Sequence, residues 1–372
     1  MKTVAVIAEF NPYHKGHGIL LGEIKKRYPG STVIAVMSGN TVQRGDFSVF
    51  DKYARAKTAV TGGFDAVFEL PFPYSCSAAE QFARAGTYIA ASLGAEVLAF
   101  GSECGSIEKL TEIARNRLSK EYEQMIPAYR AEQRGESVLR IKEKAYADLY
   151  GETAVRRSND ILACEYIKSI LTSGYDITPV AVHRVENFSA KDSRKAIYGC
   201  DKDEIRRLLP DSTVNFQLSL GMKGAENLIL GLLRLDYGSD SGNGIINAMK
   251  KRAEKCAGLE ELMSMLPTKK YTLARLRREI LAWLFSVSED DKNSIPGYTV
   301  LLAANKKGLA CISGNGKFPA IPVLTRQSDV NKLSKNAQIR FKTAQKPELI
   351  YALTFKDRRN PDLTMTPVII DV

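Results

Sequence analysis

Long hydrophobic runs are missing from this chain of 372 residues. No apolar run approaches the ~18 residues that are needed to span a bilayer, and the sequence begins directly with a predicted strand. We therefore expect a cytoplasmic protein with no part in a membrane. The composition agrees with this expectation, because 44% hydrophobic and 26% charged residues are ordinary for a globular protein in water.

Cysteine pairs and histidine are also scarce. The six cysteines are scattered without a C-x-x-C pair, so neither a zinc site nor a disulfide framework is indicated. Only three histidines occur: His14 and His17 lie in one turn, and His183 is far away in the sequence. Because no third ligand is visible beside the pair, we expect no metal bound by the protein's own side chains.

Residues 3–18 hold the most informative pattern that is present. Residues 4–8 form an unbroken apolar run typical of a strand, a turn with proline follows, and residues 18–24 have helical spacing. Where such a strand meets such a helix, unpaired N–H groups and the helix dipole favour an anion. Gly16 adds no side chain, so the imidazoles of His14 and His17 can both face a phosphate. The alternative is that both histidines are ordinary residues of a surface loop.

Strand and helix patterns alternate over the first half of the chain. Strands are predicted at 31–38, 66–70, 96–100 and 177–182, and helices at 51–61 and 77–93. This alternation predicts an α/β fold with a doubly wound, parallel, Rossmann-like sheet. We expect it to occupy residues 1–200, with a charged helical insertion near 106–150. Residues 201–372 are expected to form a second, mainly α-helical domain.

The net charge of +11 is concentrated in the last third of the chain. Residues 1–240 carry 31 Lys and Arg against 30 Asp and Glu, a net charge of +1, whereas residues 241–372 carry 22 against 12, a net charge of +10. This excess suggests a polyanionic partner, and aromatic side chains beside the cations suit RNA. The alternative is a core helix with a solvated basic face. The candidate RNA contacts are Lys269, Lys270, Arg275, Arg277 and Arg278.

Three further polar side chains stand at predicted element ends. Arg44 follows the strand at 31–38 and could meet a phosphate or a substrate carboxylate, or could be an ordinary surface residue. Asn159 opens a predicted helix, where it is either a structural cap or an amide that faces the cleft. Arg184 follows the strand at 177–182.

The His-x-Gly-His turn resembles the signature of the nucleotidyltransferase superfamily, which includes class I aminoacyl-tRNA synthetases and small adenylyltransferases. The resemblance implies that ATP is cleaved between its α and β phosphates, with His14 and His17 as catalytic residues that stabilise the charge of the transition state. Residues 189–197 resemble the second superfamily signature, a Ser/Thr-rich loop that grips the β and γ phosphates. This loop departs from the usual form, and its candidate phosphate contacts are Ser193 and Arg194.

Over nearly its whole length the chain resembles the bacterial tRNA(Met) cytidine acetate ligase family. The resemblance is carried by FNPYHKGH at 10–17, GN at 39–40, QRG at 43–45, LPFP at 70–73, FGSE at 100–103, NDIL at 159–162 and YTLARLRR at 271–278. It implies that ATP activates acetate as acetyl-adenylate, and that the acetyl group passes to the wobble cytidine of elongator tRNA(Met) to give N4-acetylcytidine. Mg²⁺ is expected to be held through the triphosphate, and the oligomeric state stays open. The family's ATP contacts correspond to Ile7, Ala8, Glu9, Phe10, Asn11, Pro12, Tyr13, His14, Lys15, Gly16, His17, Gly18, Ile19, Leu20, Gly101, Asn159 and Arg184.

Two other functions remain open at this stage. A small-molecule adenylyltransferase of cofactor biosynthesis would share the histidine turn but has no need of the basic carboxyl-terminal third. A non-catalytic RNA-binding protein would explain the altered loop at 189–197. If the ligase reaction is right, no acyl-enzyme is required, so Cys76 and Cys104 are expected to take no part in the chemistry.

Overall fold

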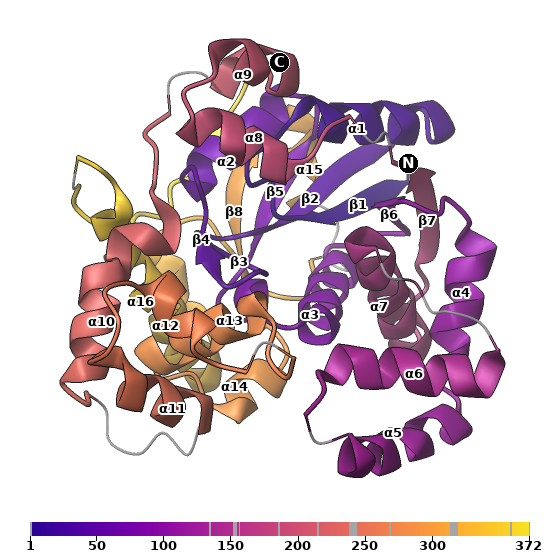
Figure 1. Ribbon diagram of the computed structural model, residues 1–372. Coiled ribbons are helices and arrows are strands. Elements are labelled where there is room, and N and C mark those ends of the chain that lie inside the picture. The colour runs from indigo at the N-terminus through magenta and orange to yellow at the C-terminus, as the bar shows by residue number, and fades with distance from the viewer. Residues whose placement is uncertain are drawn as a thin grey trace.

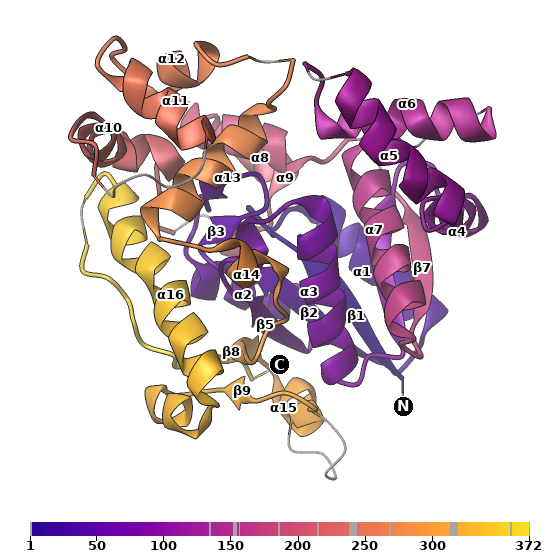
Figure 2. The same ribbon diagram turned by 90° about the horizontal axis from the view of Figure 1, so that it is seen from below.

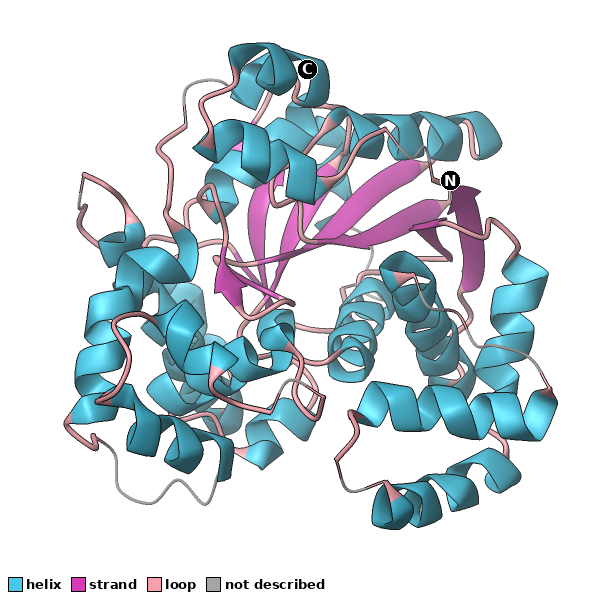
Figure 3. Cartoon of the chain, viewed as in Figure 1, coloured by secondary structure: helices cyan, strands magenta, loops and turns pink. Residues whose placement is uncertain are grey.

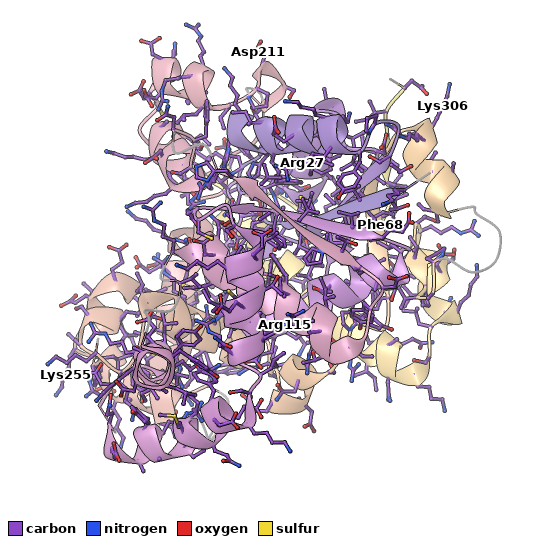
Figure 4. The ribbon with its side chains drawn as sticks, turned by 90° about the vertical axis from the view of Figure 1, so that its right-hand side faces the viewer. Arg27, Phe68, Arg115, Asp211, Lys255 and Lys306 are labelled. Atoms are coloured by element: carbon purple, nitrogen blue, oxygen red, sulfur yellow. The ribbon has the colours of Figure 1, made fainter. Side chains whose placement is uncertain are left out.

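The computed structural model describes residues 2–371, except 134, 152–154, 156, 185–186, 214–215, 238–243, 268, 313–318 and 358. Helices surround a central sheet in which β1, β2, β5, β6 and β7 run in one direction and β8, β9 and β10 run in the other (Figure 3). Phe68 lies in the interior, whereas Lys255 and Lys306 reach solvent at opposite ends of the molecule (Figure 4). Among the residues that the structure describes, no helix is long and apolar enough to cross a membrane.

A mainly parallel sheet forms the centre of the fold. Its order in the described part of the chain is β10-β8-β5-β2-β1-β6-β7, with β9 beside β8. Only the pairing of β5 with β8 is antiparallel among these neighbours. The predicted α/β fold with a doubly wound sheet is therefore confirmed. The strands are β1 (Thr3–Ala8), β2 (Thr32–Ser38), β5 (Ala66–Leu70), β6 (Val97–Ser102), β7 (Thr178–His183), β8 (Thr299–Ala304), β9 (Val323–Leu324) and β10 (Val368–Ile369).

The first strand shows why helices cover both faces of the sheet. Successive side chains of a strand point to opposite faces, and in β1 Val4 and Val6 enter one core while Ala5 and Ile7 enter the other. The first of these cores is covered by α1 (Lys15–Arg27) and α2 (Lys52–Thr61). The second is covered by α3 (Ala79–Ser92), α4 (Ile107–Asn116) and α7 (Ser158–Ser173), with α3 lying across the strands in Figure 2.

Two helical lobes extend from the sheet (Figure 1). One contains α5 (Lys120–Glu132) and α6 (Val138–Tyr150), in the region where the sequence predicts a helical insertion. The other has its own core of buried residues, such as Ile229, Leu262 and Ile280. Its helices are α10 (Glu226–Arg234), α11 (Gly244–Ala253), α12 (Leu259–Ser264), α13 (Leu273–Leu284) and α14 (Glu289–Asn293), joined by the end of α16 (Lys335–Tyr351).

The remaining elements connect these parts. Helices α8 (Ala190–Tyr198) and α9 (Lys202–Leu208) pack on Val49 and Phe50, and α15 (Lys306–Ile312) follows β8. Short 3-10 helices occupy Tyr74–Cys76, Asp211–Thr213, Gly221–Ala225, Gln327–Lys332 and Ala352–Thr354.

The carboxyl-terminal part of the chain does not form a separate helical domain throughout. Strands β8 and β10, which follow residue 298, complete the sheet begun by β1, so the expected boundary at residue 200 does not divide two independent folds. The physical reason is that β5 would otherwise present an unpaired edge. A buried ion-pair cluster strengthens the connection, because Lys52 lies 3.1 Å from Glu69 of β5 and 3.2 Å from Glu348 of α16.

A hairpin occupies the segment after β2, where the sequence predicts no strand. It consists of β3 (Thr41–Val42) and β4 (Asp46–Phe47), which pair antiparallel. Gly45 turns between them with a φ of 76°, and a Cβ at this position would lie 2.5 Å from the backbone nitrogen of Arg278. Glycine is therefore needed at this turn, both for its positive φ and for the close packing of the hairpin on α13.

Candidate active site

The two histidines stack on each other where β1 meets α1. His14 immediately precedes the first residue of α1, and His17 lies in the first turn. Their ring centroids are 3.8 Å apart with an interplanar angle of 27°. The backbone N–H of His14 donates to Nδ1 of His17 at 3.1 Å, which leaves the proton of a neutral His17 ring on Nε2. The turn therefore presents a defined N–H donor beside the helix amino terminus.

Burial keeps both imidazoles neutral. Removal from water, followed by charge repulsion from Arg184 and Arg194, lowers the pKa of His14 from 6.5 to about 4. Burial, followed by the neighbouring His14 and Arg184, holds the pKa of His17 well below its ordinary value. Nδ1 of His14 is buried and has no hydrogen-bond partner among the described residues. A buried polar atom of this kind suits a site that is completed by a ligand.

Acid should destabilise the fold through these two rings. Because their pKa values are lower in the folded protein than in the unfolded chain, the unfolded chain binds more protons, and stability falls as the pH drops from about 6.5 towards 4. For His14 alone we expect a loss of about 2 kcal/mol between about pH 6.5 and pH 5. Urea unfolding at several pH values measures this loss. The double variant H14Q/H17N should show a flatter dependence, and an unchanged slope would contradict the buried, neutral state.

Gly16 is required by the packing of the turn. A Cβ at this position would lie 2.9 Å from Cε1 and Nδ1 of the His14 ring and 2.9 Å from Cβ of Phe188. Atoms cannot approach so closely without displacement. The glycine in the His-x-Gly-His pattern thus allows the ring of His14 to lie flat against the backbone of the turn.

Two guanidinium groups, from the end of β7 and from α8, lie near this turn. Arg184 follows β7 and donates to the carbonyl of Phe188 at 3.0 Å. Arg194, on α8, donates from Nη1 to the carbonyl of Asn11 at 2.6 Å. Both cations are close enough to His14 to lower its pKa. Positive charge, N–H donors and a helix amino terminus therefore converge, which is the environment that a polyphosphate needs.

A carboxylate organises the neighbouring end of β6. Glu103 Oε1 accepts a hydrogen bond from Nδ2 of Asn159 at 2.7 Å and lies 3.5 Å from Arg184 Nη1. Its Oε2 accepts from the backbone N–H of Asp160 at 3.1 Å. Asn159 thus lies inside the first turn of α7 and is not its cap. Beside this network a Cβ on Gly101 would meet only open space. Glu103 had no predicted role, although its position after a parallel strand was a usable signal.

We predict that Glu103 positions Asn159 and Arg184. In E103Q the side chain keeps its size but loses its charge and one acceptor, so both partners lose a charge-assisted contact. ATP affinity should fall by about tenfold in calorimetric titrations. Glu108, an exposed residue of α4, offers the matched control E108Q, for which the affinity should not change. Equal affinities for the wild type and E103Q would contradict this role.

Arg55 holds the two neighbouring loops in place. This buried residue of α2 donates to the backbone carbonyls of Glu9 at 2.6 Å, Ser38 at 3.1 Å and Gly39 at 2.6 Å. It also donates to the carbonyl of Phe50 at 2.9 Å. The ends of β1 and β2 are thereby fixed to each other. No sequence pattern distinguishes this arginine from a surface residue of a helix.

The other predicted phosphate and loop residues occupy varied positions. Ser193 is buried, and its hydroxyl donates to the carbonyl of Ser189 at 2.9 Å within α8. Lys15 extends away from the turn and donates to the carbonyl of Arg206 at 2.7 Å. Arg44 is exposed at the tip of the hairpin. Arg194 contacts the turn from another element, through its hydrogen bond to the carbonyl of Asn11.

The five predicted RNA-binding cations fall into two groups. Lys269 and Lys270 are exposed, and the guanidinium of Arg275 lies 5.1 Å from the ring centre of Tyr271. In contrast, Arg277 lies 3.3 Å from Asp46, and Arg278 donates to the carbonyl of Gln43 at 3.1 Å. The second group therefore faces the hairpin at the carboxyl edge of the sheet.

The sheet order and the parallel pairing of its first strands are those of a Rossmann-like fold. Together with a helix amino terminus and cations that suit phosphates, this fold places the protein in the class of nucleotidyltransferases. Comparison with known proteins agrees, because the sequence profile described as HIGH nucleotidyl transferase matches residues 1–364. The chain belongs to the tRNA(Met) cytidine acetate ligase family within that class. It is 30% identical to the tRNA(Met) cytidine acetate ligase of Thermoanaerobacter sp., over 96% of both chains, and 30% identical to that of Bacillus subtilis, over 88% of both.

A solved structure gives the same result for the fold. The crystal structure of Thermotoga maritima TmcAL bound with alpha-thio ATP superposes with a TM-score of 0.87 at 25% sequence identity. The match covers 100% of each chain. The similarity therefore extends over both helical lobes as well as the sheet.

Proposed function

We propose that this protein uses ATP to activate acetate as acetyl-adenylate and transfers the acetyl group to the wobble cytidine of elongator tRNA(Met), forming N4-acetylcytidine. The observation that carries the proposal is the stacked, neutral pair of His14 and His17 at the amino terminus of α1, faced by Arg184 and Arg194. The names of the relatives supply the acceptor and the acid.

The triphosphate binds at the turn between β1 and α1. Its oxygens accept hydrogen bonds from His14, His17 and the first backbone N–H groups of α1, while the two arginines balance its charge. The adenosine lies towards β6, where Gly101 leaves open space and where Asn159 and Arg184 are held by Glu103. The binding of an ATP analogue by the structural relative supports a nucleotide as the ligand.

In the first chemical step a carboxylate oxygen of acetate attacks the α phosphorus of ATP. The new P–O bond replaces the bond to the bridging oxygen of the β phosphate, and pyrophosphate leaves with that electron pair. Negative charge grows on the phosphate oxygens during this exchange. Preorganised N–H donors of His14 and His17 stabilise this charge more in the transition state than in the ground state, which lowers the barrier.

In the second step the exocyclic amine of cytosine attacks the carbonyl carbon of acetyl-adenylate. AMP leaves as the new C–N bond forms, and the amine loses one proton. The base must leave its stack in the anticodon loop to reach the anhydride. Lys269, Lys270 and Arg275 are proposed contacts of the tRNA backbone, and the ring of Tyr271 holds the last two in place. Arg277 and Arg278 of the same predicted set act at the hairpin instead.

Mg²⁺ is proposed to enter with the nucleotide, because phosphate oxygens are ligands that this ion prefers. In the described parts of the chain, no group of three His, Cys, Asp or Glu side chains could hold a metal ion. The bound ion would balance charge on the triphosphate. We place the reaction in the cytoplasm, where the tRNA substrate is found.

A complete reaction tests the proposal. The protein is incubated with ATP, Mg²⁺, acetate and unmodified elongator tRNA(Met), and the digested nucleosides are analysed by mass spectrometry. Acetylcytidine should form only when every component is present, with one AMP and one pyrophosphate released per acetyl group. Turnover without acetate, or on a mononucleotide in place of tRNA, would favour a small-molecule adenylyltransferase.

A further inference from the structure

Arg278 is a partly buried cation without a carboxylate partner. Its Nη1 donates to the carbonyl of Gln43 at 3.1 Å, and burial lowers its pKa. Among the residues that the structure describes, no carboxylate lies within ion-pair distance of it, and the charge of the adjacent Glu279 only partly offsets the effect of burial on its pKa. The adjacent Arg277 is different, because Asp46 lies 3.3 Å away. A guanidinium that is removed from water and not neutralised favours an anionic ligand.

The hairpin connects Arg278 to the residue that precedes the histidine turn, through Gln43. The backbone N–H of Gln43 donates to Oε1 of Glu9 at 2.8 Å, and the carbonyl of the same residue accepts from Arg278. Glu9 follows β1 directly, and the ring of the next residue, Phe10, lies edge-on to His17 with centroids 4.8 Å apart. A single residue of the hairpin thus joins Arg278 to the start of the turn.

Arg278 and the adenosine contacts lie on opposite sides of β1. In the sheet, β1 is flanked by β2 on one side and by β6 on the other. Gly101 and Asn159 belong to the β6 side, whereas the hairpin that contacts Arg278 follows β2. If the adenosine lies on the β6 side and the phosphates lie at α1, the β2 side stays free. The group that attacks the α phosphorus can then bind there.

We propose that Arg278 binds the carboxylate of the acid substrate on the β2 side of the turn. This inference rests on the proposed function, in which two anions must meet. A carboxylate is repelled by a triphosphate, so a fixed cation is needed to bring it close, and a planar guanidinium matches its two oxygens. When one carboxylate oxygen bonds to phosphorus, the bond to pyrophosphate breaks and takes the electron pair. No proton moves in this step.

The surroundings of Arg278 suit an acid with a short apolar tail. The thiol of Cys76 is buried, and it and Arg278 influence each other's pKa. Cys76 belongs to the same apolar cluster as Phe47 and Phe72, which lines this side of the hairpin. A methyl group directed to these side chains would leave the carboxylate at the guanidinium.

Acetate-dependent exchange of labelled pyrophosphate into ATP, measured without tRNA, tests the assignment. R278A and R278K should raise the KM for acetate by about tenfold to a hundredfold, since each loses a bidentate, charge-assisted contact. Affinity for ATP, measured by calorimetry, should stay unchanged. Added guanidinium ion should partly restore acetate use in R278A, which a purely structural role of Arg278 would not allow.

Arg340 offers a matched control. It also donates from Nη1 to one backbone carbonyl, that of Ile295, at 3.1 Å, but it lies on α16 away from the hairpin. R340A should leave the KM for acetate as it is in the wild type. Melting temperatures of all variants check the fold, and R278K serves if R278A does not fold.

Two outcomes would overturn the inference. An unchanged KM for acetate together with weaker tRNA binding would make Arg278 a contact of an RNA phosphate. An unchanged KM without any change in tRNA binding would leave it as a structural residue. Failure of the proposed function is a separate result, because then the wild type itself would show no acetate-dependent exchange.

Discussion

Acetyl-adenylate formation should be lost when His17 is replaced by alanine. The Nε2–H of this ring is a donor whose direction is fixed by the hydrogen bond between the His14 backbone and Nδ1. Removal of one such preorganised donor costs about 100- to 1,000-fold in rate. A single-turnover assay with labelled ATP and acetate measures the adenylate directly. Affinity for tRNA should remain near that of the wild type, because the ring lies far from the exposed cations in sequence and faces the phosphate site.

Asparagine at position 17 separates catalysis from folding. Its Oδ1 occupies the place of Nδ1 and can accept the same hydrogen bond from His14, but it has no donor where Nε2 lies. H17N should therefore melt close to the wild-type temperature and remain as slow as H17A. If either variant formed acetyl-adenylate at the wild-type rate, the chemistry assigned to the histidine turn would be wrong.

Loss of the exposed lysines before α13 and of the half-buried Arg275 within it should weaken tRNA binding. In the triple variant K269A/K270A/R275A, three candidate phosphate contacts disappear. Each phosphate contact contributes about 0.7 to 0.9 to the slope of log affinity against log salt concentration, so the slope should fall by about 2 to 3. Affinity should fall by about tenfold or more at low salt. Filter binding over a series of salt concentrations gives both quantities.

A second triple variant controls for net charge. Lys306 on α15 and Lys335 and Lys342 on α16 are exposed, and their replacement by alanine removes the same charge from another region. This variant should keep the wild-type salt slope, and both triples should form acetyl-adenylate normally in the absence of tRNA. Equal losses of slope in the two triples would show that RNA attraction is diffuse and not located at α13.

Local sequence patterns predicted much of the structure of the first 200 residues. The apolar run of β1, the turn with His14 and His17 and the start of α1 are all determined by residues close together in the chain. The alternation of strands and helices then predicted the parallel sheet, and the structure confirms it. These features were accessible because their signals, side-chain periodicity and turn residues, are local.

Other features depend on contacts between distant segments. Nothing near β8 in the sequence indicates that it will pair antiparallel with β5, more than 200 residues earlier. Arg55 is buried because four carbonyls from three separate segments of the chain surround it. The side chain of Arg278 is held by the carbonyl of Gln43, and its backbone packs on Gly45, both of which lie in the other half of the chain. Such non-local contacts leave no periodic pattern in the sequence.

Oxygen transfer from acetate tests the central claim most directly. If a carboxylate oxygen attacks the α phosphorus, that oxygen remains on phosphorus when the acetyl group moves to cytidine. With ¹⁸O-labelled acetate, ATP and tRNA, mass spectrometry should find one labelled oxygen in each AMP and none in pyrophosphate. Unlabelled AMP, formed alongside acetylated tRNA, would show that the acid is not activated as an adenylate at this site.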